Sequence, residues 1–319
     1  MSVSAAMAGV LTGHASADPL AQAANDGSHI DHVVPIDARH STVYVYSAAM
    51  NRVIGMRVMH AADTSMPQPT LYLLNGAEDG IADNGVETSW ETKTDVDNFL
   101  SDQNVNVVTI LDGRYTYYTD WVADDPRLGR NRWTTFLTQE LPPLLDTELD
   151  ANGRNAIAGV SMSAGAALSL AEDAPGLYRS VGSFSGCAET STDPGRRYAQ
   201  AVVLSGGGNP WNMWGVDGSP GWVQNDPSTP ANLEKLRGVN LYITAGDSGS
   251  AAAGRSNAAG GMLESVVSTC THELQTRTEQ LGIPATYSYT PGGQHAWPYW
   301  QDALHEAWPS FKQSLRENS

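Results

Sequence analysis

The stretch Asn155-Ala156-Ile157-Ala158-Gly159-Val160-Ser161-Met162-Ser163 decides the fold, together with the small residues Ala164-Gly165-Ala166-Ala167-Leu168-Ser169-Leu170-Ala171 that follow it. Residues 155–158 are apolar enough for a buried strand, and residues 164–171 are compatible with a helix. A serine on a tight turn between a strand and a helix is typical of the nucleophile elbow of serine-dependent hydrolases and acyltransferases. The alternative interpretation of so short a motif is an ordinary strand-to-helix turn.

Composition limits the classes of protein that the chain can represent. Its 319 residues are 41% hydrophobic, which is enough for one large globular domain or two smaller ones. The net charge of −17 argues against binding to nucleic acid, because phosphates require basic patches. It argues equally against electrostatic docking on anionic lipid. We therefore expect a globular protein with an acidic surface.

The N-terminal segment is typical of a processing sequence. Residues 4–11 are apolar, and Ala15-Ser16-Ala17 fits a small-residue cleavage site before Asp18. The basic residues that normally begin a signal peptide are missing, so residues 1–17 are interpreted as a signal-peptide-like remnant. No other stretch approaches the roughly 20 apolar residues needed to span a bilayer. The sequence thus predicts an exported protein, with a flexible lead-in over residues 18–41 and the folded domain over residues 42–315.

Strand patterns alternate with helical patterns along this domain. The expected strands are Thr42–Tyr46, Ile54–Met59, Thr70–Leu74, Val105–Leu111, Asn155–Val160, Ser180–Ser185, Asn240–Ala245 and Ala285–Thr290. The expected helices include Asp95–Ser101, Arg132–Leu145 and Gly261–Leu281. The later strands are nearly continuous apolar runs, as expected for parallel strands covered on both faces. The pattern predicts an α/β fold of the α/β-hydrolase type, with an eight-stranded mostly parallel sheet, helices on both faces, an early hairpin and a Gly-, Pro- and Trp-rich insertion at about 187–238.

A nucleophilic Ser161 requires a histidine base later in the chain. In an α/β hydrolase the chain order is serine, acid and then histidine. Only His272, His295 and His305 follow Ser161. His272 and His305 lie in helix-like sequence, whereas His295 lies in a loop directly after the last expected strand. His295 is therefore the predicted base, and an ordinary surface histidine is the alternative.

Two carboxylates are candidates for the acid that orients this histidine. Asp247 directly follows the strand Asn240–Ala245, which is the usual position of the acid in this fold. Glu264 lies later, in the first turns of an expected helix, where a glutamate is ordinarily a solvated charge. The local pattern by itself favours Asp247.

An oxyanion hole needs two preorganised N–H donors. One is expected from Met162, the residue after the nucleophile, and the other from the loop that follows the strand Thr70–Leu74. The N–H group of Ala77 is the candidate in that loop, because Gly76 permits a sharp backbone turn there.

The chain contains two cysteines, Cys187 and Cys270. In an exported protein an isolated pair favours a disulfide over a metal site, which would need more ligands at closer spacing. Two buried free thiols are the alternative.

Several segments resemble the secreted trehalose mycolyltransferase antigens, which form part of the esterase-D branch of α/β hydrolases. These segments are Tyr72-Leu73-Leu74-Asn75-Gly76-Ala77, Tyr118-Thr119-Asp120-Trp121, residues 133–142 (WTTFLTQELP), Gly159-Val160-Ser161-Met162, Met213-Trp214-Gly215, Asn225-Asp226-Pro227 and His295-Ala296-Trp297-Pro298-Tyr299-Trp300. The resemblance runs from about Thr42 to Phe311. It is closest to the corynebacterial-type members, given Ser185-Gly186-Cys187-Ala188-Glu189-Thr190 and Cys270-Thr271-His272.

The resemblance implies a different acid from the one that local pattern favours. The family's acid is a glutamate about thirty residues before the histidine, and Glu264 stands at that distance from His295. The predicted catalytic residues are therefore Ser161, Glu264 and His295, with Asp247 as the alternative acid. The resemblance also assigns the nucleophile to Ser161 rather than Ser163.

The family resemblance further implies the reaction. A mycolyl group would move from trehalose monomycolate, through an ester on Ser161, to a second trehalose monomycolate or to cell-wall arabinogalactan. The implied location is secreted or in the cell envelope, and neither a cofactor nor a metal is expected.

The family's sugar-binding pair is commonly an aspartate and an arginine three residues later, and here Asn75 and Glu78 occupy these positions. Asn75 and Trp297 are the predicted substrate-binding residues, with core packing as the alternative for Trp297.

Two other classes of function remain open from the sequence. One is a secreted carboxylesterase or thioesterase that uses water as the acceptor. The other is a non-catalytic cell-wall binding module that kept the fold.

Overall fold

The computed structural model describes residues 26–80, 88–247 and 258–316. The strands are β1 (His29–Pro35), β2 (His40–Ser47), β3 (Arg52–Met59), β4 (Gln68–Leu74), β5 (Asn106–Ile110), β6 (Ala151–Val160), β7 (Tyr178–Phe184), β8 (Asn240–Asp247) and β9 (Thr286–Pro291). The helices are α2 (Ser89–Lys93), α3 (Val96–Phe99), α4 (Trp133–Thr135), α5 (Leu141–Glu148), α6 (Met162–Asp173), α7 (Asp193–Ser205), α8 (Trp211–Trp214), α9 (Pro220–Gln224), α10 (Pro230–Leu233), α11 (Ala258–Leu281) and α12 (Trp297–Arg316). A π-helical turn, Phe136–Glu140, joins α4 to α5, and a 3₁₀ turn, Glu234–Leu236, follows α10.

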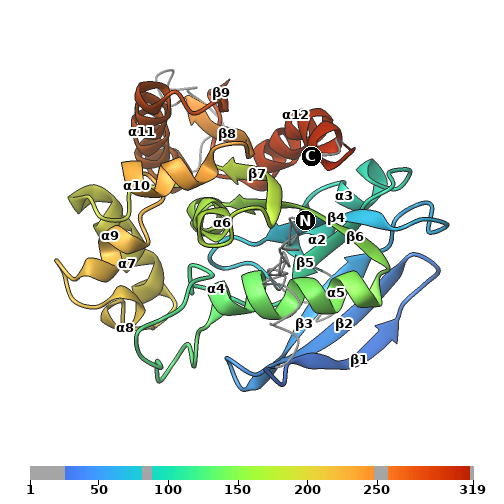
Figure 1. Cartoon of the computed structure of the whole chain (residues 1–319). Coiled ribbons are helices and arrows are strands. Elements are labelled where there is room, and N and C mark those ends of the chain that lie inside the picture. The colour runs from blue at the N-terminus through green and yellow to red at the C-terminus, as the bar shows by residue number, and fades with distance from the viewer. Residues whose placement is uncertain (1–25, 81–87, 248–257, 317–319) are drawn as a thin grey trace, which may run out of the picture.

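One sheet runs through the molecule, with the strand order β1-β2-β3-β5-β4-β6-β7-β8-β9 (Figure 1). Strands β1, β2 and β3 pair antiparallel, and β3 pairs antiparallel with β5. The remaining pairs, from β5 through β4 to β9, are parallel. The predicted fold class is confirmed, since each of the eight expected strands corresponds to one of β2–β9 and the early hairpin is β2–β3.

The sheet has one strand more than the sequence predicts. Residues 29–35 were expected in a flexible lead-in, but they form β1 and pair with β2 at the edge of the sheet. The strand was missed because His29, Asp31 and His32 interrupt its apolar residues and nearly the whole strand is exposed. An edge strand of this kind is held by main-chain hydrogen bonds rather than by burial of one face. The signal-peptide-like remnant at residues 1–17 lies outside the described residues.

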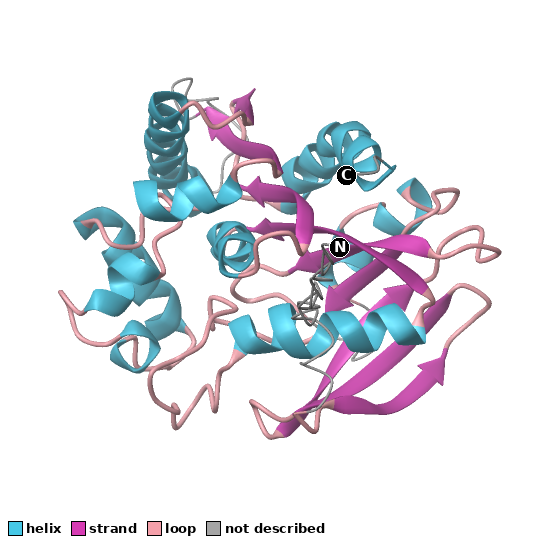
Figure 2. Ribbon diagram, viewed as in Figure 1, coloured by secondary structure: helices cyan, strands magenta, loops and turns pink. Residues whose placement is uncertain are grey.

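Side chains on the two faces of the sheet enter two separate hydrophobic clusters. Along β4, Tyr72 and Leu74 join one cluster, whereas Leu71 and Leu73 join the other. Helix α6 covers the first face and α12 the second (Figure 2). This two-sided burial explains why the central strands are apolar at consecutive positions instead of at alternate ones.

The segment between β7 and β8 departs from the regular alternation of strands and helices. The predicted insertion at about 187–238 contains α7, α8, α9 and α10, which gather at one end of the molecule (Figure 1). Within the part of the chain that the structure describes, no helix is both long and apolar enough to cross a membrane.

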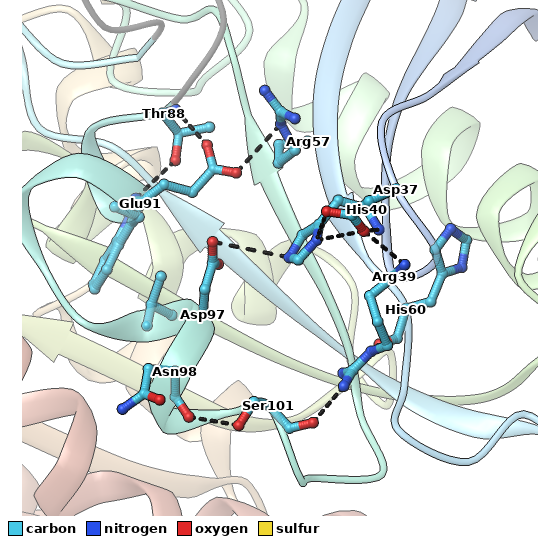
Figure 3. Close-up of polar contacts among 12 residues, drawn as sticks. Asp37, Arg39, His40, Arg57, His60, Thr88, Glu91, Asp97, Asn98 and Ser101 are labelled. Carbon is cyan, nitrogen blue, oxygen red and sulfur yellow. Dashed lines mark hydrogen bonds and ion pairs between the residues drawn. The ribbon is translucent and has the colours of Figure 1, made fainter.

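Polar side chains fasten the antiparallel end of the sheet to α2 and α3 (Figure 3). Arg57 of β3 lies 3.3 Å from a carboxylate oxygen of Glu91, and Glu91 also closes a capping box with Thr88 at the start of α2. His40 of β2 lies 3.8 Å from the carboxylate of Asp97 in α3. The buried Arg57–Glu91 pair therefore fixes α2 against β3.

Candidate active site

Ser161 stands on the turn between β6 and α6 in a strained backbone conformation. Its φ is 57° and its ψ is −119°, a region that residues with a side chain rarely adopt. A methyl group on Gly159 would overlap the carbonyl of Ser163, and one on Gly186 would lie 2.7 Å from the carbonyl oxygen of Ser161. Glycine at both positions lets β6, α6 and the end of β7 meet closely, so the serine is held at the apex of the turn.

Three side chains from distant parts of the chain form a continuous hydrogen-bonded row. The Nε2 atom of His295 lies 2.7 Å from Oγ of Ser161, and its Nδ1 lies 2.8 Å from a carboxylate oxygen of Glu264. His295 comes from the loop between β9 and α12, and Glu264 comes from α11. With a proton on Nδ1 donated to Glu264, Nε2 is free to accept the proton of the serine hydroxyl.

Glu264 is almost completely buried, at 1% exposed, and is bonded on both carboxylate oxygens. One oxygen accepts the Gly246 N–H at 2.6 Å and the Ser185 hydroxyl at 2.9 Å, and the other accepts His295. Burial by itself would raise the pKa of Glu264, but these hydrogen bonds outweigh it and lower the pKa below its ordinary value. The residue is therefore an anion at neutral pH and can stabilise a protonated imidazole. Ser185 and Gly246 were not predicted, because neither carries a sequence signal of its own.

The alternative acid, Asp247, lies at the exposed end of β8. The geometry brings Glu264 to His295 and leaves Asp247 outside the hydrogen-bonded row. The usual position of the acid after this strand is thus occupied by a residue that faces solvent, and a helix supplies the carboxylate instead.

The other serine and histidine candidates have structural partners elsewhere. The hydroxyl of Ser163 is fully buried and donates to the main-chain carbonyl of Val160 at 3.0 Å. His272 bonds a main-chain carbonyl within its own helix, α11. His305 of α12 lies 2.8 Å from the carboxylate of Asp95. All three therefore hold local structure.

The two segments expected to form the oxyanion hole converge on Ser161. Met162 is the first residue of α6, so its N–H belongs to the unpaired helix start. On the other side, a methyl group built on Gly76 would lie 3.8 Å from Cβ of Ser161, which brings the loop carrying Ala77 beside the nucleophile. The donor roles of Ala77 and Met162 remain predictions that this arrangement supports.

The two predicted substrate contacts differ in their surroundings. Asn75 is completely buried, and its side-chain amide donates to the carbonyl of Ile110. The structure therefore does not support a sugar contact from Asn75. Trp297 is half-buried and meets the rings of Trp90 and Trp300 edge to face, both at 5.1 Å between centroids. Packing accounts for its position, and its contact with substrate stays a prediction.

A residue that the sequence analysis missed reaches the nucleophile from the insertion. The phenol of Tyr198, in α7, lies beside the side chain of Ser161, close enough for that side chain to affect its pKa. Burial raises the pKa of Tyr198 to about 12, although the contact with Ser161 opposes that rise. The phenol is thus a neutral donor at neutral pH. No sequence signal could have found it, because its place depends on how the insertion folds back over the sheet.

Cys187 and Cys270 form a disulfide, as predicted, with 5.1 Å between their Cα atoms. Cys187 lies just after β7, and Cys270 lies on α11, the helix that carries Glu264. The bridge therefore ties the acid-bearing helix to the segment beside the elbow.

A serine at a strand-to-helix elbow, with a histidine after the last strand and a buried carboxylate behind it, defines the class of the α/β hydrolases with a serine nucleophile. The sequence matches the family described as “Putative esterase” over residues 47–311. It is 31% identical over 265 residues to diacylglycerol acyltransferase/mycolyltransferase Ag85A of Mycobacterium gordonae, covering 80% of this chain and 75% of that protein. It is 28% identical to the Ag85A protein of Mycobacterium leprae over 282 residues, covering 85% and 82% of the two chains.

Solved structures show the same fold. Mycobacterium tuberculosis MPT51 superimposes with a TM-score of 0.72 at 22% identity, covering 89% of this chain and 98% of that one. An S-formylglutathione hydrolase from Agrobacterium tumefaciens superimposes with a TM-score of 0.67 at 15% identity, covering 90% and 99%. The chain belongs to the esterase family and, within it, to the mycolyltransferase antigens. It is accordingly a serine-dependent acyltransferase of the mycolyltransferase type.

Proposed function

We propose that the protein transfers a mycolyl group from trehalose monomycolate to a second trehalose monomycolate or to cell-wall arabinogalactan, by way of an ester on Ser161. The observation that carries this proposal is the Ser161–His295–Glu264 row in a member of the mycolyltransferase antigens. We propose that the reaction takes place outside the cell or in its envelope.

In the first half of the reaction, His295 Nε2 takes the proton of Ser161 while Oγ attacks the carbonyl carbon of the mycolyl ester. The main-chain N–H groups of Ala77 and Met162 bind the oxyanion that forms. Glu264 stabilises the protonated imidazole from its other side. The imidazolium then gives its proton to the departing trehalose oxygen, and the acyl group remains on Ser161.

The second half reverses these roles. A sugar hydroxyl gives its proton to His295 as its oxygen attacks the acyl carbon. The bond to Ser161 Oγ breaks, and Oγ recovers a proton from the imidazolium, so the enzyme returns to its starting state. Ser161 is only 8% exposed, which limits the access of bulk water to the acyl-enzyme.

The contacts to the donor sugar are expected to differ from the family's common pair. Asn75 is buried, and Glu78 is exposed and negatively charged where an arginine is common. We therefore propose that other residues around the site recognise trehalose.

Incubation with trehalose monomycolate followed by lipid analysis tests the proposal. Dimycolate and free trehalose are expected from the native chain and not from Ser161→Ala, whose folding is checked by its Tm. Free mycolic acid formed at a rate that added sugar acceptor does not change would instead indicate an esterase. Failure of an active-serine phosphonate probe to label Ser161 would indicate a non-catalytic binding module.

A further inference from the structure

Large apolar side chains stand exposed on the insertion and on the loop beside it. We call this set the insertion patch, and its members are Val122, Leu204, Trp211, Val216 and Val223, each between 56% and 64% exposed. Exposed apolar residues are ordinary when they are scattered singly, but a group of them on one part of a surface indicates a contact site. These five lie on or beside α7, α8 and α9, the helices that gather at one end of the molecule (Figure 1).

The members of the patch are linked by direct structural relations. Leu204 and Trp211 line one open surface pocket of about 480 Å³. The Val122 N–H donates to the carbonyl of Met213 at 3.0 Å, which places Val122 beside α8. Helix α9, which carries Val223, packs on α8.

The segment that supplies most of the patch is free of charge. Residues 198–216 contain no Asp, Glu, Lys, Arg or His, in a chain whose net charge is −17. Two ionic side chains, Asp125 and Arg127, also line the pocket between Leu204 and Trp211. The carboxylate of Asp125 is engaged by main-chain N–H groups, including that of Asn209 at 2.9 Å. The stretch itself is thus neutral although the protein as a whole is acidic, and the exposed Asp124 and Asp217 lie at its borders.

The patch lies close to the nucleophile along a single helix. Tyr198 of α7 lies beside Ser161, and Leu204 follows it by six residues on the same helix. At 1.5 Å per residue these two positions are about 9 Å apart along the helix axis. If Leu204 and Trp211 rest on a lipid surface, Ser161 therefore lies close enough to that surface to be reached by a long-chain substrate.

We propose that the insertion patch docks the protein on a surface of neutral glycolipid, from which the acyl donor enters the site. This inference rests on the proposed function for the identity of the lipid. An anionic bilayer would repel a chain of this net charge, whereas trehalose esters carry no charge and present sugar hydroxyls above alkyl chains. An indole such as Trp211 suits that boundary, because its ring is apolar and its N–H can bond the sugar layer.

Vesicle flotation with the full chain tests the docking directly. The probes are neutral vesicles that contain a synthetic long-chain trehalose diester and, separately, vesicles rich in phosphatidylglycerol. The variant combines Leu204→Ser, Trp211→Ser and Val216→Ser. The matched control combines Val34→Ser, Ile36→Ser and Met66→Ser, three exposed apolar residues far from the insertion in sequence. We expect the patch variant to lower binding to the trehalose-ester vesicles by about tenfold or more, with the control variant within twofold of the native chain.

An activity comparison supplies the second readout. Hydrolysis of a soluble activated ester should be unchanged in the patch variant, which shows that the site is intact, while transfer from vesicle-embedded donor should fall in parallel with binding. Equal binding by native and patch variant, or stronger binding to the anionic vesicles, would overturn the docking inference. So would sedimentation showing that the patch joins two copies of the chain. Because flotation needs no catalysis and works with Ser161→Ala, docking can be confirmed or refuted even if transfer to sugar is not observed.

Discussion

The elbow at residues 159–165 and the insertion at residues 187–238 differ in how much of each is tightly packed. In the elbow every residue is buried, and a methyl group on Gly159 would lie 2.2 Å from the carbonyl oxygen of Ser163. The insertion also has tight positions, such as Gly195, but it adds open ones such as Gly218, where an added methyl group would meet nothing, and apolar side chains that stand exposed. The two regions meet at Ser161, which the elbow contains and beside which Tyr198 of the insertion lies.

This difference separates two tasks. The elbow fixes the nucleophile relative to the sheet, so its sequence is restricted at almost every position. The insertion covers the nucleophile and meets the surroundings, so its surface can change while the chemistry is kept. Substitutions in the elbow should therefore act on folding and on the chemical step, whereas those on the outer surface of the insertion should act on access and on choice of substrate.

The largest expected difference between the two regions comes from adding one methyl group to a glycine in each. Gly159→Ala should prevent folding, with a loss of at least about 5 kcal/mol, because the new Cβ overlaps the Ser163 carbonyl. Gly218→Ala should cost about 1 kcal/mol, since its φ of 83° is the only obstacle. Urea unfolding of the native chain and of Gly218→Ala measures the small loss, and the far-UV circular dichroism of Gly159→Ala shows whether that variant folds. Similar losses in the two variants would remove the distinction between a tight and a tolerant region.

The next test concerns the acid. Glu264→Gln should lower kcat by about 10³–10⁴-fold, because the imidazolium loses its buried counter-charge. Asp247→Asn, at the exposed end of β8, should stay within about threefold of the native rate. Steady-state kinetics with a soluble ester distinguishes the two. A large loss in the Asp247 variant alone would show that Asp247, which the local sequence pattern favours, is the catalytic acid.

The disulfide joins the segment that opens the insertion to the helix that carries Glu264. Replacing both cysteines by alanine should lower stability by about 4 kcal/mol, because the bridge closes a loop with a sequence separation of 83 residues. The activity that remains at low temperature should also fall, since α11 loses its fixed position beside the elbow. Thermal unfolding and single-temperature kinetics provide the two measurements. Full activity together with lowered Tm would show that packing alone positions Glu264.

The smallest expected effect comes from the insertion's own contact with the nucleophile. Tyr198→Phe should slow acylation of Ser161 by about tenfold, because Oγ loses the polar hydroxyl that lies beside it. Tyr117→Phe is the matched control, since the Tyr117 hydroxyl is buried and has no hydrogen-bond partner among the described residues. Burst kinetics with an activated ester isolates the acylation step. If both phenylalanine variants behave alike, Tyr198 only fills space.

Much of this arrangement could be predicted from the sequence, whereas the features that were missed or misassigned lack a local sequence signal. Strands β2–β9, the elbow and His295 follow from periodicity and from chain order. The acid was found through the family resemblance and not through local pattern, because a helix delivers Glu264 to the place where Asp247 would be expected. Strand β1 was missed because polar residues interrupt it and nearly all of it is exposed. Tyr198 was missed because its position beside Ser161 depends on a contact between distant parts of the chain. Asn75 was predicted to bind substrate from the family resemblance, while the fold buries it completely.

The bridge between Cys187 and Cys270 has a consequence for when the enzyme becomes active. Such a bond does not persist in a reducing compartment. A chain still on the reducing side of a membrane would hold all three side chains of the row, but nothing covalent would tie the glutamate helix to the elbow. We therefore expect completion of the site to accompany the proposed export, with the newly made chain a poor catalyst until it reaches an oxidising compartment.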